Sequence, residues 1–260
     1  MTMKKTVAFI QSMKQNAAKI AMLTAYDYPT ARILNDAEID IILVGDSLGM
    51  VMMGYEDTRS VTMADMLHHT RIVARGNTEC LLVADLPYMA YETPEQAVRN
   101  AHLLRDAGAD AVKPEGNKPE IAKAIIDDGI PVIGHVGLLP QTSEKFRVHG
   151  RKRNEARKIY DDAKTLEDAG CFAIVLESVP EALGTEITQS LRIPTVGIGA
   201  GPNCDGQVLV IHDVLGLFDR FTPTFVKQYA NLQKEIHRAV THYQLEVQEG
   251  RFPDEDHSYR

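Results

Sequence analysis

The sequence predicts a closed (β/α)8 TIM barrel, an α/β fold in a single domain that spans residues 1–260. The chain has 260 residues, close to the roughly 250 of a typical barrel of this kind. Eight short aliphatic runs recur along it, each apolar on both faces, as the strands of a helix-covered parallel sheet must be. The predicted strands are residues 20–25, 41–45, 81–84, 109–113, 130–134, 172–176, 193–198 and 207–211.

Segments with helical periodicity lie between most of these runs. Several of them close near a glycine, at Gly108, Gly129 or Gly170, which is a common end signal of a helix. Before the last strand, residues 201–206 leave no room for a full helix. The clearest predicted helices are residues 93–107, 118–127, 154–169 and 180–190.

Two further helices are predicted, one at each end of the barrel sequence. Val7, Phe9, Ile10 and Met13 suit a short amphipathic helix near the N-terminus, where no long apolar run or cleavage pattern indicates a targeting segment. Residues 226–249 predict a longer amphipathic helix, a C-terminal extension that we interpret as a packing or subunit contact.

Composition excludes several classes of protein. The formal charge is −8 and no block of Lys and Arg is interleaved with aromatic residues, so nucleic acid is not an expected partner. No apolar run reaches the roughly 18 residues of a membrane span, so no membrane association is expected and a cytoplasmic location is the default. The three cysteines are widely spaced and odd in number, which favours neither a disulfide framework nor a zinc site.

Charged side chains follow nearly every predicted strand. The carboxyl ends of parallel barrel strands open at one mouth, so four or five carboxylates would converge there. Buried like charges repel one another, and a bound cation is the simplest way to neutralise them. Carboxylates without a Cys/His cluster favour a hard ion, Mg²⁺ first and Mn²⁺ second. The residues concerned are Asp27, Asp46, Asp85, Lys113, Glu115, His135, Glu177, His212 and Asp213.

Several of the acidic residues also have a structural interpretation. Asp27 and Asp213 are expected to be helix N-caps. Asp46 and Asp85 each end an apolar strand and precede a loop, which favours a role at the metal. Glu177 either caps the next helix or acts as a base; because Ser178 can serve as the cap, we favour the base.

The remaining strand-end residues leave alternatives open. Lys113 and Glu115 lie two apart and would form a buried ion pair if both pointed inward, although Pro114 suggests that the strand ends near Lys113. His135 and His212 could be ordinary buried histidines. Of the two, His135 is the better functional candidate because it lies at a predicted mouth position.

Motifs over nearly the whole chain resemble, in order, those of the 3-methyl-2-oxobutanoate (ketopantoate) hydroxymethyltransferase family. The most specific is Leu43-Val-Gly-Asp-Ser-Leu-Gly-Met50. The others lie at residues 23–28, 61–65, 69–70, 84–91, 134–141, 176–180, 197–201, 205–213, 252–253 and 257–258. The resemblance implies transfer of a hydroxymethyl group from 5,10-methylenetetrahydrofolate to 3-methyl-2-oxobutanoate. The product would be 2-dehydropantoate, in the first committed step of pantothenate biosynthesis.

The same resemblance implies the roles of individual residues. One Mg²⁺ per subunit would be held by Asp46, Asp85 and Glu115. Glu177 corresponds to the family's proton acceptor. Contacts to the oxo acid would come from Asp46, Ser47, Asp85 and Lys113. Independently of the resemblance, the position of His135 at the mouth predicts an accessory role for it. A homo-oligomer, commonly a decamer built as a pentamer of dimers, is also implied.

Two places depart from the family's usual pattern. Pro114 stands where an aliphatic residue is usual, and the loop after Gln141 is shorter and lacks paired glycines. This loop is expected to border the folate entrance, and residues 136–153 are a predicted closing element.

Two competing functions are weighed against this one. A barrel lyase could cleave a 2-oxo or 2-hydroxy acid through the same Mg²⁺-stabilised enolate, but several such enzymes use a loop cysteine, and neither long loop here contains one. A non-catalytic protein that binds an oxo acid would be expected to have lost the base or a metal ligand, and this chain retains both.

Overall fold

A parallel barrel of eight strands is found in the computed structural model, which describes residues 4–143 and 147–259. The strands are hydrogen-bonded in the order β4-β3-β2-β1-β8-β7-β6-β5. A parallel bridge between Val112 and Val132, and a bond of 3.0 Å from the Val112 N–H to the Pro131 carbonyl, close the ring between β4 and β5. The strands are β1 Ile20–Thr24, β2 Ile41–Val44, β3 Leu81–Asp85, β4 Ala111–Lys113, β5 Ile133–Gly137, β6 Ala173–Glu177, β7 Thr195–Ile198 and β8 Gly206–Leu209. The predicted barrel is confirmed.

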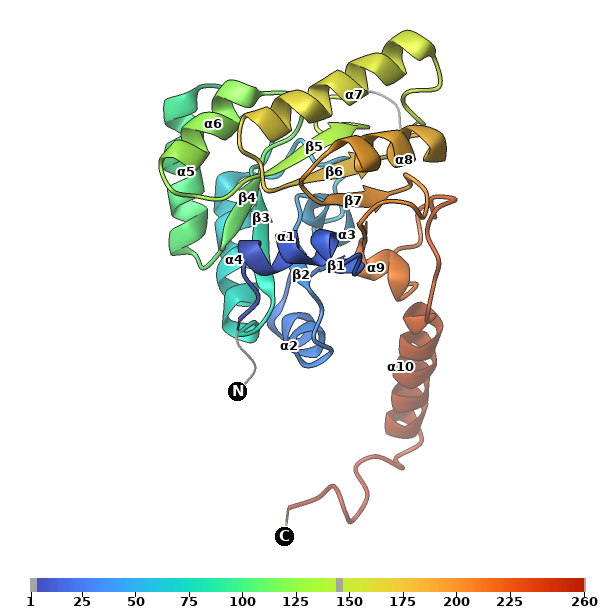
Figure 1. Ribbon diagram of the computed structural model, residues 1–260. Helices are drawn as coiled ribbons and strands as arrows, with labels where there is room; N and C mark the ends of the chain where they lie inside the picture. The colour runs from blue at the N-terminus through green and yellow to red at the C-terminus, as the bar shows by residue number, and fades with distance from the viewer. Residues whose placement is uncertain (1–3, 144–146, 260) are drawn as a thin grey trace. The chain divides into compact units, whose positions relative to one another are not determined.

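Helices alternate with these strands and cover the outside of the barrel (Figure 1). The four helices with predicted bounds, at residues 93–107, 118–127, 154–169 and 180–190, each begin and end within one residue of those bounds. Asp27 caps α2 by accepting a bond of 2.8 Å from the Thr30 N–H, which confirms its interpretation as an N-cap. Between β7 and β8 there is only a loop, as predicted. The helices that precede β8 in the chain are α1 Val7–Gln15, α2 Tyr28–Asp36, α3 Leu48–Val51, α4 Met63–Gly76, α5 Pro94–Asp106, α6 Pro119–Asp127, α7 Arg153–Asp168 and α8 Glu181–Ser190.

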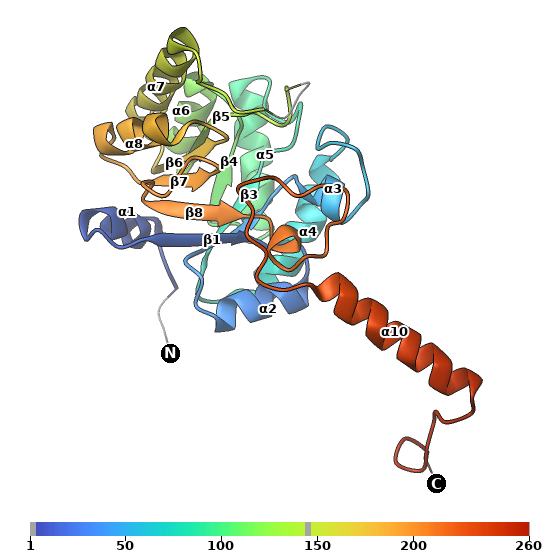
Figure 2. The same cartoon turned by 90° about the vertical axis from the view of Figure 1, so that its right-hand side faces the viewer.

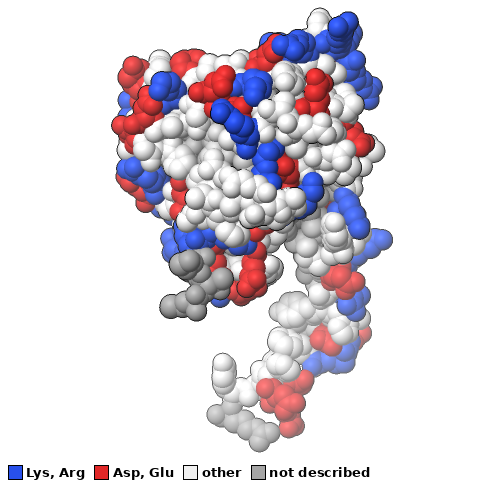
Figure 3. Space-filling model, viewed as in Figure 1, with Lys and Arg blue, Asp and Glu red and all other residues white. Residues whose placement is uncertain are grey.

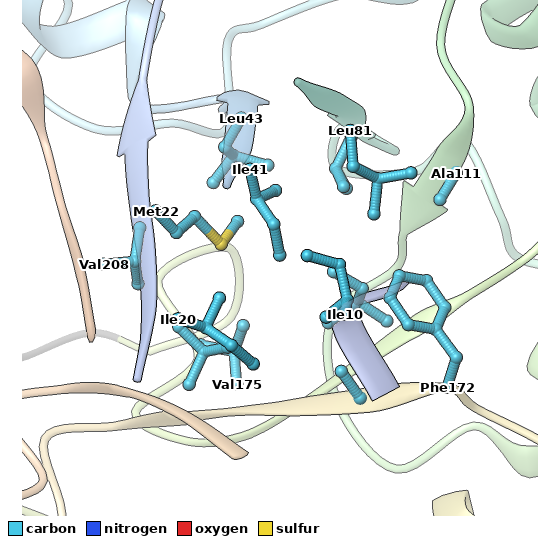
Figure 4. Close-up of a cluster of buried hydrophobic side chains, with 14 residues drawn as sticks. Ile10, Ile20, Met22, Ile41, Leu43, Leu81, Ala111, Phe172, Val175 and Val208 are labelled. Atoms are coloured by element: carbon cyan, nitrogen blue, oxygen red, sulfur yellow. The ribbon is translucent and has the colours of Figure 1, made fainter. Parts of the chain in front are cut away.

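The N-terminal helix α1 closes the end of the barrel opposite α3 (Figure 2). Ile10, on its inner face, is fully buried and packs into the core among inward-facing strand residues (Figure 4). Lys14, one helical turn after Ile10, anchors the helix through an ion pair of 2.8 Å with Asp205. Because α1 fills the end of the barrel where the strands begin, the opposite end, where the strands finish, is left as the mouth of the barrel.

Residues 1–210 and 211–260 form two compact units. The second contains the short helix α9, Ile211–Val214, and the long helix α10, Leu232–Gln248. The start of α10 lies six residues after the predicted one because Asn231 caps it, accepting a bond of 3.2 Å from the Lys234 N–H. Asp213 lies inside α9 and not at its start, so its interpretation as an N-cap was wrong. That the whole chain is one domain stays a prediction.

The surface carries both signs of charge. Figure 3 shows basic and acidic side chains interspersed over the face that is seen in Figure 1. On α7 they form ion pairs one helical turn apart, Arg157 with Asp161 and Lys158 with Asp162, both at 2.9 Å. Over residues 4–143 and 147–259, no helix has the length and apolar character that a membrane span needs.

Candidate active site

Three buried carboxylates come from neighbouring strands at the mouth. Asp85 is the last residue of β3, Asp46 lies two residues beyond β2, and Glu115 lies two residues beyond β4. Their exposed fractions are only 3% for Asp85, 8% for Asp46 and 6% for Glu115. Parallel neighbouring strands end on the same side, so the three predicted metal ligands lie in one region of the structure.

Asp85 is the centre of the first set of contacts. Its Oδ1 lies 2.8 Å from the Nζ of Lys113, and its Oδ2 accepts a bond of 3.0 Å from the Asp46 N–H. The buried partner of Lys113 is therefore Asp85 and not Glu115. The reason is that β4 ends at Lys113, so the chain beyond it no longer follows the two-residue alternation of a strand.

Gln141 joins the other two carboxylates. Its side-chain Nε2 donates to Asp46 Oδ2 at 2.7 Å, and its backbone N–H donates to Glu115 Oε1 at 3.0 Å. The Tyr91 hydroxyl donates to the Gln141 Oε1 and accepts from the Glu115 N–H at 3.2 Å. In the sequence Gln141 is marked only as part of the motif at residues 134–141. Nothing local indicates that it reaches a residue 95 positions away.

Ser47 lies beside the carboxylates at the N-cap of α3 but makes no capping bond with its side chain. Its Oγ is instead 2.8 Å from the hydroxyl of the buried Tyr26. A hydroxyl that is not used as a cap is available to orient a ligand. Tyr26 was not predicted at the site, because its position after β1 carries no charge to mark it.

Glu177 ends β6 on the other side of the mouth, next to His135. Its Oε2 is 3.1 Å from the His135 Nε2, and the His135 Nδ1 is 3.9 Å from Glu115 Oε2. His135 thus lies between two carboxylates. The expectation that it ends its strand was wrong, because β5 continues to Gly137, where the backbone turns with φ +102°.

The expected helix cap after Glu177 was also wrong. Ser178 has a left-handed backbone (φ +50°), and the N-cap of α8 is Pro180, which makes no side-chain bond. The Ser178 N–H donates to the Ile198 carbonyl at 2.8 Å, so Ser178 links β6 to β7. Glu177 is not needed as a cap either, which leaves its carboxylate, 16% exposed, facing His135.

Ionisation of all three carboxyl groups would leave an excess of negative charge, and the pKa values of Asp46 and Glu115 reflect this. Burial, strengthened by Asp85, raises the pKa of Asp46 to about 7. Burial and then Asp46 raise the pKa of Glu115 to about 9. Burial opposes the charge on Lys113, but the attraction of Asp85 and Asp46 outweighs it and raises the Lys113 pKa. Burial and the nearby Lys113 lower the pKa of His135. Lys113 alone does not balance three carboxylates.

This imbalance is what a divalent cation would correct. Among the described residues, no three His, Cys, Asp or Glu side chains are arranged as a complete ligand set. Mg²⁺ does not require one, because it is commonly held by one or two carboxylates, several waters and the substrate. The hard oxygen donors of Asp46 and Asp85, with Glu115 nearby, fit such an ion.

Comparison with known proteins gives a consistent result over the full length. A family model described as ketopantoate hydroxymethyltransferase matches residues 4–255. The 3-methyl-2-oxobutanoate hydroxymethyltransferase of Syntrophus aciditrophicus is 53% identical over 263 residues, covering 98% of this chain and 97% of the relative. The protein of the same name from Geobacter metallireducens is 48% identical over 266 residues, with 100% of both chains covered.

Solved structures share the fold at low sequence identity. A phosphonopyruvate hydrolase in complex with oxalate and Mg²⁺ matches with a TM-score of 0.66 and 13% identity, covering 97% of this chain and 93% of the other. A 2,3-dimethylmalate lyase of the PEP mutase/isocitrate lyase superfamily matches with a TM-score of 0.62 and 14% identity, covering 95% and 89%. At such identities the likeness concerns the barrel alone.

Proposed function

The chain belongs to the ketopantoate hydroxymethyltransferase family, and we propose that the acidic mouth of its barrel performs the family's reaction with one bound divalent cation. Its function is hydroxymethyl transfer to 3-methyl-2-oxobutanoate in pantothenate biosynthesis, with methylenetetrahydrofolate as the one-carbon donor. The product is 2-dehydropantoate. What remains to be assigned is which residues carry out the chemistry.

The observation that carries the proposal is the buried cluster of Asp46, Asp85 and Glu115 with Lys113 as its cation. Asp46 and Asp85 are the proposed ligands of Mg²⁺, with Glu115 close to the ion. When bound there, Mg²⁺ would supply positive charge beside the ketone oxygen of the substrate, where negative charge develops as C3 loses its proton.

Lys113 and Ser47 are proposed to position the oxo acid. The Lys113 ammonium, kept charged by Asp85, would attract the substrate carboxylate. The Ser47 hydroxyl, oriented by Tyr26, would hydrogen-bond to the acid. Together they orient C3 toward the opposite side of the mouth, where Glu177 lies.

Glu177 is the proposed base. Its carboxylate would take the proton from C3, and the electron pair of the broken C–H bond then forms the new bond to the methylene carbon of the donor. Both C–N bonds that join this carbon to the folate break, and water supplies the hydroxyl oxygen of the product. The proton from C3 and one proton of the water go to the two folate nitrogens, which releases tetrahydrofolate. His135 lies 3.1 Å from Glu177 Oε2 and has a lowered pKa. It is thus a neutral neighbour, proposed to orient the base without neutralising it.

Three further expectations stay proposals. The closing loop at residues 136–153 includes positions 144–146, which lie outside the described residues. A homo-oligomer, a decamer by resemblance, and a cytoplasmic location are likewise proposed from the family.

The lyase and the non-catalytic binding protein remain distinguishable by experiment. The decisive assay supplies 3-methyl-2-oxobutanoate and methylenetetrahydrofolate, with EDTA and then with added Mg²⁺, and measures 2-dehydropantoate. We expect folate-dependent turnover that EDTA abolishes and Mg²⁺ restores. Asp46→Asn should remove it, while the exposed control Asp36→Asn should not. Cleavage of an oxo acid without folate would support the lyase, and binding without turnover would support the binding protein.

A further inference from the structure

The side-chain amide of Gln141 hydrogen-bonds through both its nitrogen and its oxygen, and so links a proposed metal ligand to the barrel. Its Nε2 donates both protons, one to Asp46 Oδ2 at 2.7 Å and one to the Leu86 carbonyl at 3.0 Å. Its Oε1 accepts from the Tyr91 hydroxyl. The residue is only 2% exposed, so a lost bond would not be replaced by bulk water.

The surroundings fix which way the amide faces. The Tyr91 hydroxyl accepts a bond from the Glu115 N–H at 3.2 Å, so its own proton is directed to Gln141 Oε1. If the amide were rotated by 180°, its oxygen would face the Leu86 carbonyl, which has no proton to donate, and the Asp46 carboxylate, which has none when it is ionised to bind a metal. Only one orientation satisfies all of these partners, and it directs an N–H at Asp46.

We propose that Gln141 is a positioning residue of the metal site, which binds one oxygen of Asp46 and one of Glu115 so that the second oxygen of each is left for a divalent cation. The inference rests on the proposed function. Asp46 Oδ2 is occupied by the side-chain amide and Glu115 Oε1 by the backbone N–H, both from this one residue. The oxygens left for the ion are Asp46 Oδ1 and Glu115 Oε2.

An amide suits this task better than a cationic side chain. A Lys or Arg in its place would neutralise Asp46 and compete with the metal for it. A neutral donor stabilises the carboxylate in one rotamer and leaves the excess negative charge for the ion. Partners of this kind, which orient metal ligands without touching the metal, commonly change metal affinity by 10- to 100-fold when they are replaced.

The test measures metal binding directly. Mn²⁺ serves as the probe, and its dissociation constant is measured by electron paramagnetic resonance without substrate. Gln141→Met, which keeps the length of the side chain but has no amide, should raise the constant roughly 10- to 100-fold. Tyr91→Phe removes only the hydroxyl that fixes the amide, and should raise it by roughly 3- to 10-fold. Tyr88→Phe, a matched control at an exposed tyrosine of the same loop, should leave it unchanged.

A second readout separates positioning from general damage. Circular dichroism first establishes that the variants fold. At saturating Mn²⁺, the rate of C3 proton exchange in Gln141→Met should return to within about threefold of the wild-type rate, because the base is not altered. Wild-type affinity for Mn²⁺ in both variants would overturn this inference alone. A wild-type chain that binds no Mn²⁺ would overturn the metal site and this inference together. Tyr91→Phe still decides the matter if Gln141→Met does not fold.

Discussion

The Nζ of Lys113 lies 2.8 Å from Oδ1 of Asp85, and both side chains are almost completely buried. The two residues are direct partners in the register of β3 and β4. Removing one member of a buried ion pair leaves the other charge without compensation, which typically costs about 3–5 kcal/mol. We therefore expect Lys113→Met to lower the free energy of unfolding by several kcal/mol, measured by urea denaturation in EDTA. Lys158→Met is the control, because Lys158 pairs with Asp162 while 75% exposed and should cost under about 1 kcal/mol. Equal losses in the two variants would contradict the importance of the buried pair.

Replacing the proposed base should separate binding from chemistry. Glu177→Gln keeps the shape of the side chain but cannot accept the C3 proton. We expect exchange of that proton with solvent deuterium, followed by NMR, to fall by at least about 100-fold. Binding of the oxo acid should persist. Glu186→Gln, on the exposed side of α8, should exchange at the wild-type rate. Normal exchange in Glu177→Gln would remove Glu177 from its role.

The backbone around Glu177 should tolerate no side chain at Gly137. A Cβ built there would lie 2.1 Å from the Glu177 carbonyl oxygen, which accepts a bond of 2.8 Å from the Leu138 N–H. Gly137→Ala should therefore displace Glu177 and reduce both the C3 exchange rate and stability, the latter by more than about 1 kcal/mol.

The control for that variant is Gly129→Ala. Gly129 also has a positive φ, +82°, but no atom lies within 4 Å of an added Cβ. Gly129→Ala should lose only the stability that a positive φ costs a residue other than glycine, and its rate of C3 proton exchange should equal that of the wild type. If Gly137→Ala exchanges as fast as Gly129→Ala, the base does not depend on this close approach.

Stability without metal should fall as the pH rises. Burial, reinforced by Asp85, raises the Asp46 pKa from 3.8 to about 7; burial, then Asp46, raises the Glu115 pKa from 4.5 to about 9. A carboxyl group with a raised pKa binds its proton more tightly in the folded state. Its stabilising effect is complete below the unfolded pKa and is lost as the pH rises through the folded one. In EDTA, the melting temperature should decrease between about pH 5 and 9.

Mg²⁺ should oppose this loss, because it binds the charged carboxylates. The increase in melting temperature on adding Mg²⁺ should be larger at pH 8 than at pH 6. Asp46→Asn, which cannot ionise, should flatten the pH dependence below about pH 7 and reduce the effect of Mg²⁺. A melting temperature in EDTA that rises over this range would contradict the raised pKa values.

The order of elements was predictable because it depends on local pattern. Apolar runs and helical periodicity repeat along the chain, and the packing of α1 followed from the spacing of Val7, Ile10 and Met13. The register of the strands was harder to predict from the sequence, because a strand that is apolar on both faces does not show at which residue its pairing begins. Pro131 has no N–H for a strand ladder, and regular pairing in β5 starts at Ile133, three residues after the predicted start. That shift moved His135 from the end of its strand to the interior.

The sequence by itself determined the barrel and the set of acidic strand ends, because both depend on residue type and on spacing within single elements. Only the tertiary structure decided which of those side chains are partners. Asp46 is hydrogen-bonded to Asp85 and to Gln141, which lie 39 and 95 positions further along the chain. Such contacts depend on strand register and on the path of the loop after β5, and no local pattern encodes either. The same physical reason applies to three uncharged residues of the site, Tyr26, Tyr91 and Gln141. No local sequence pattern marks them as site residues, so only the folded chain identifies them.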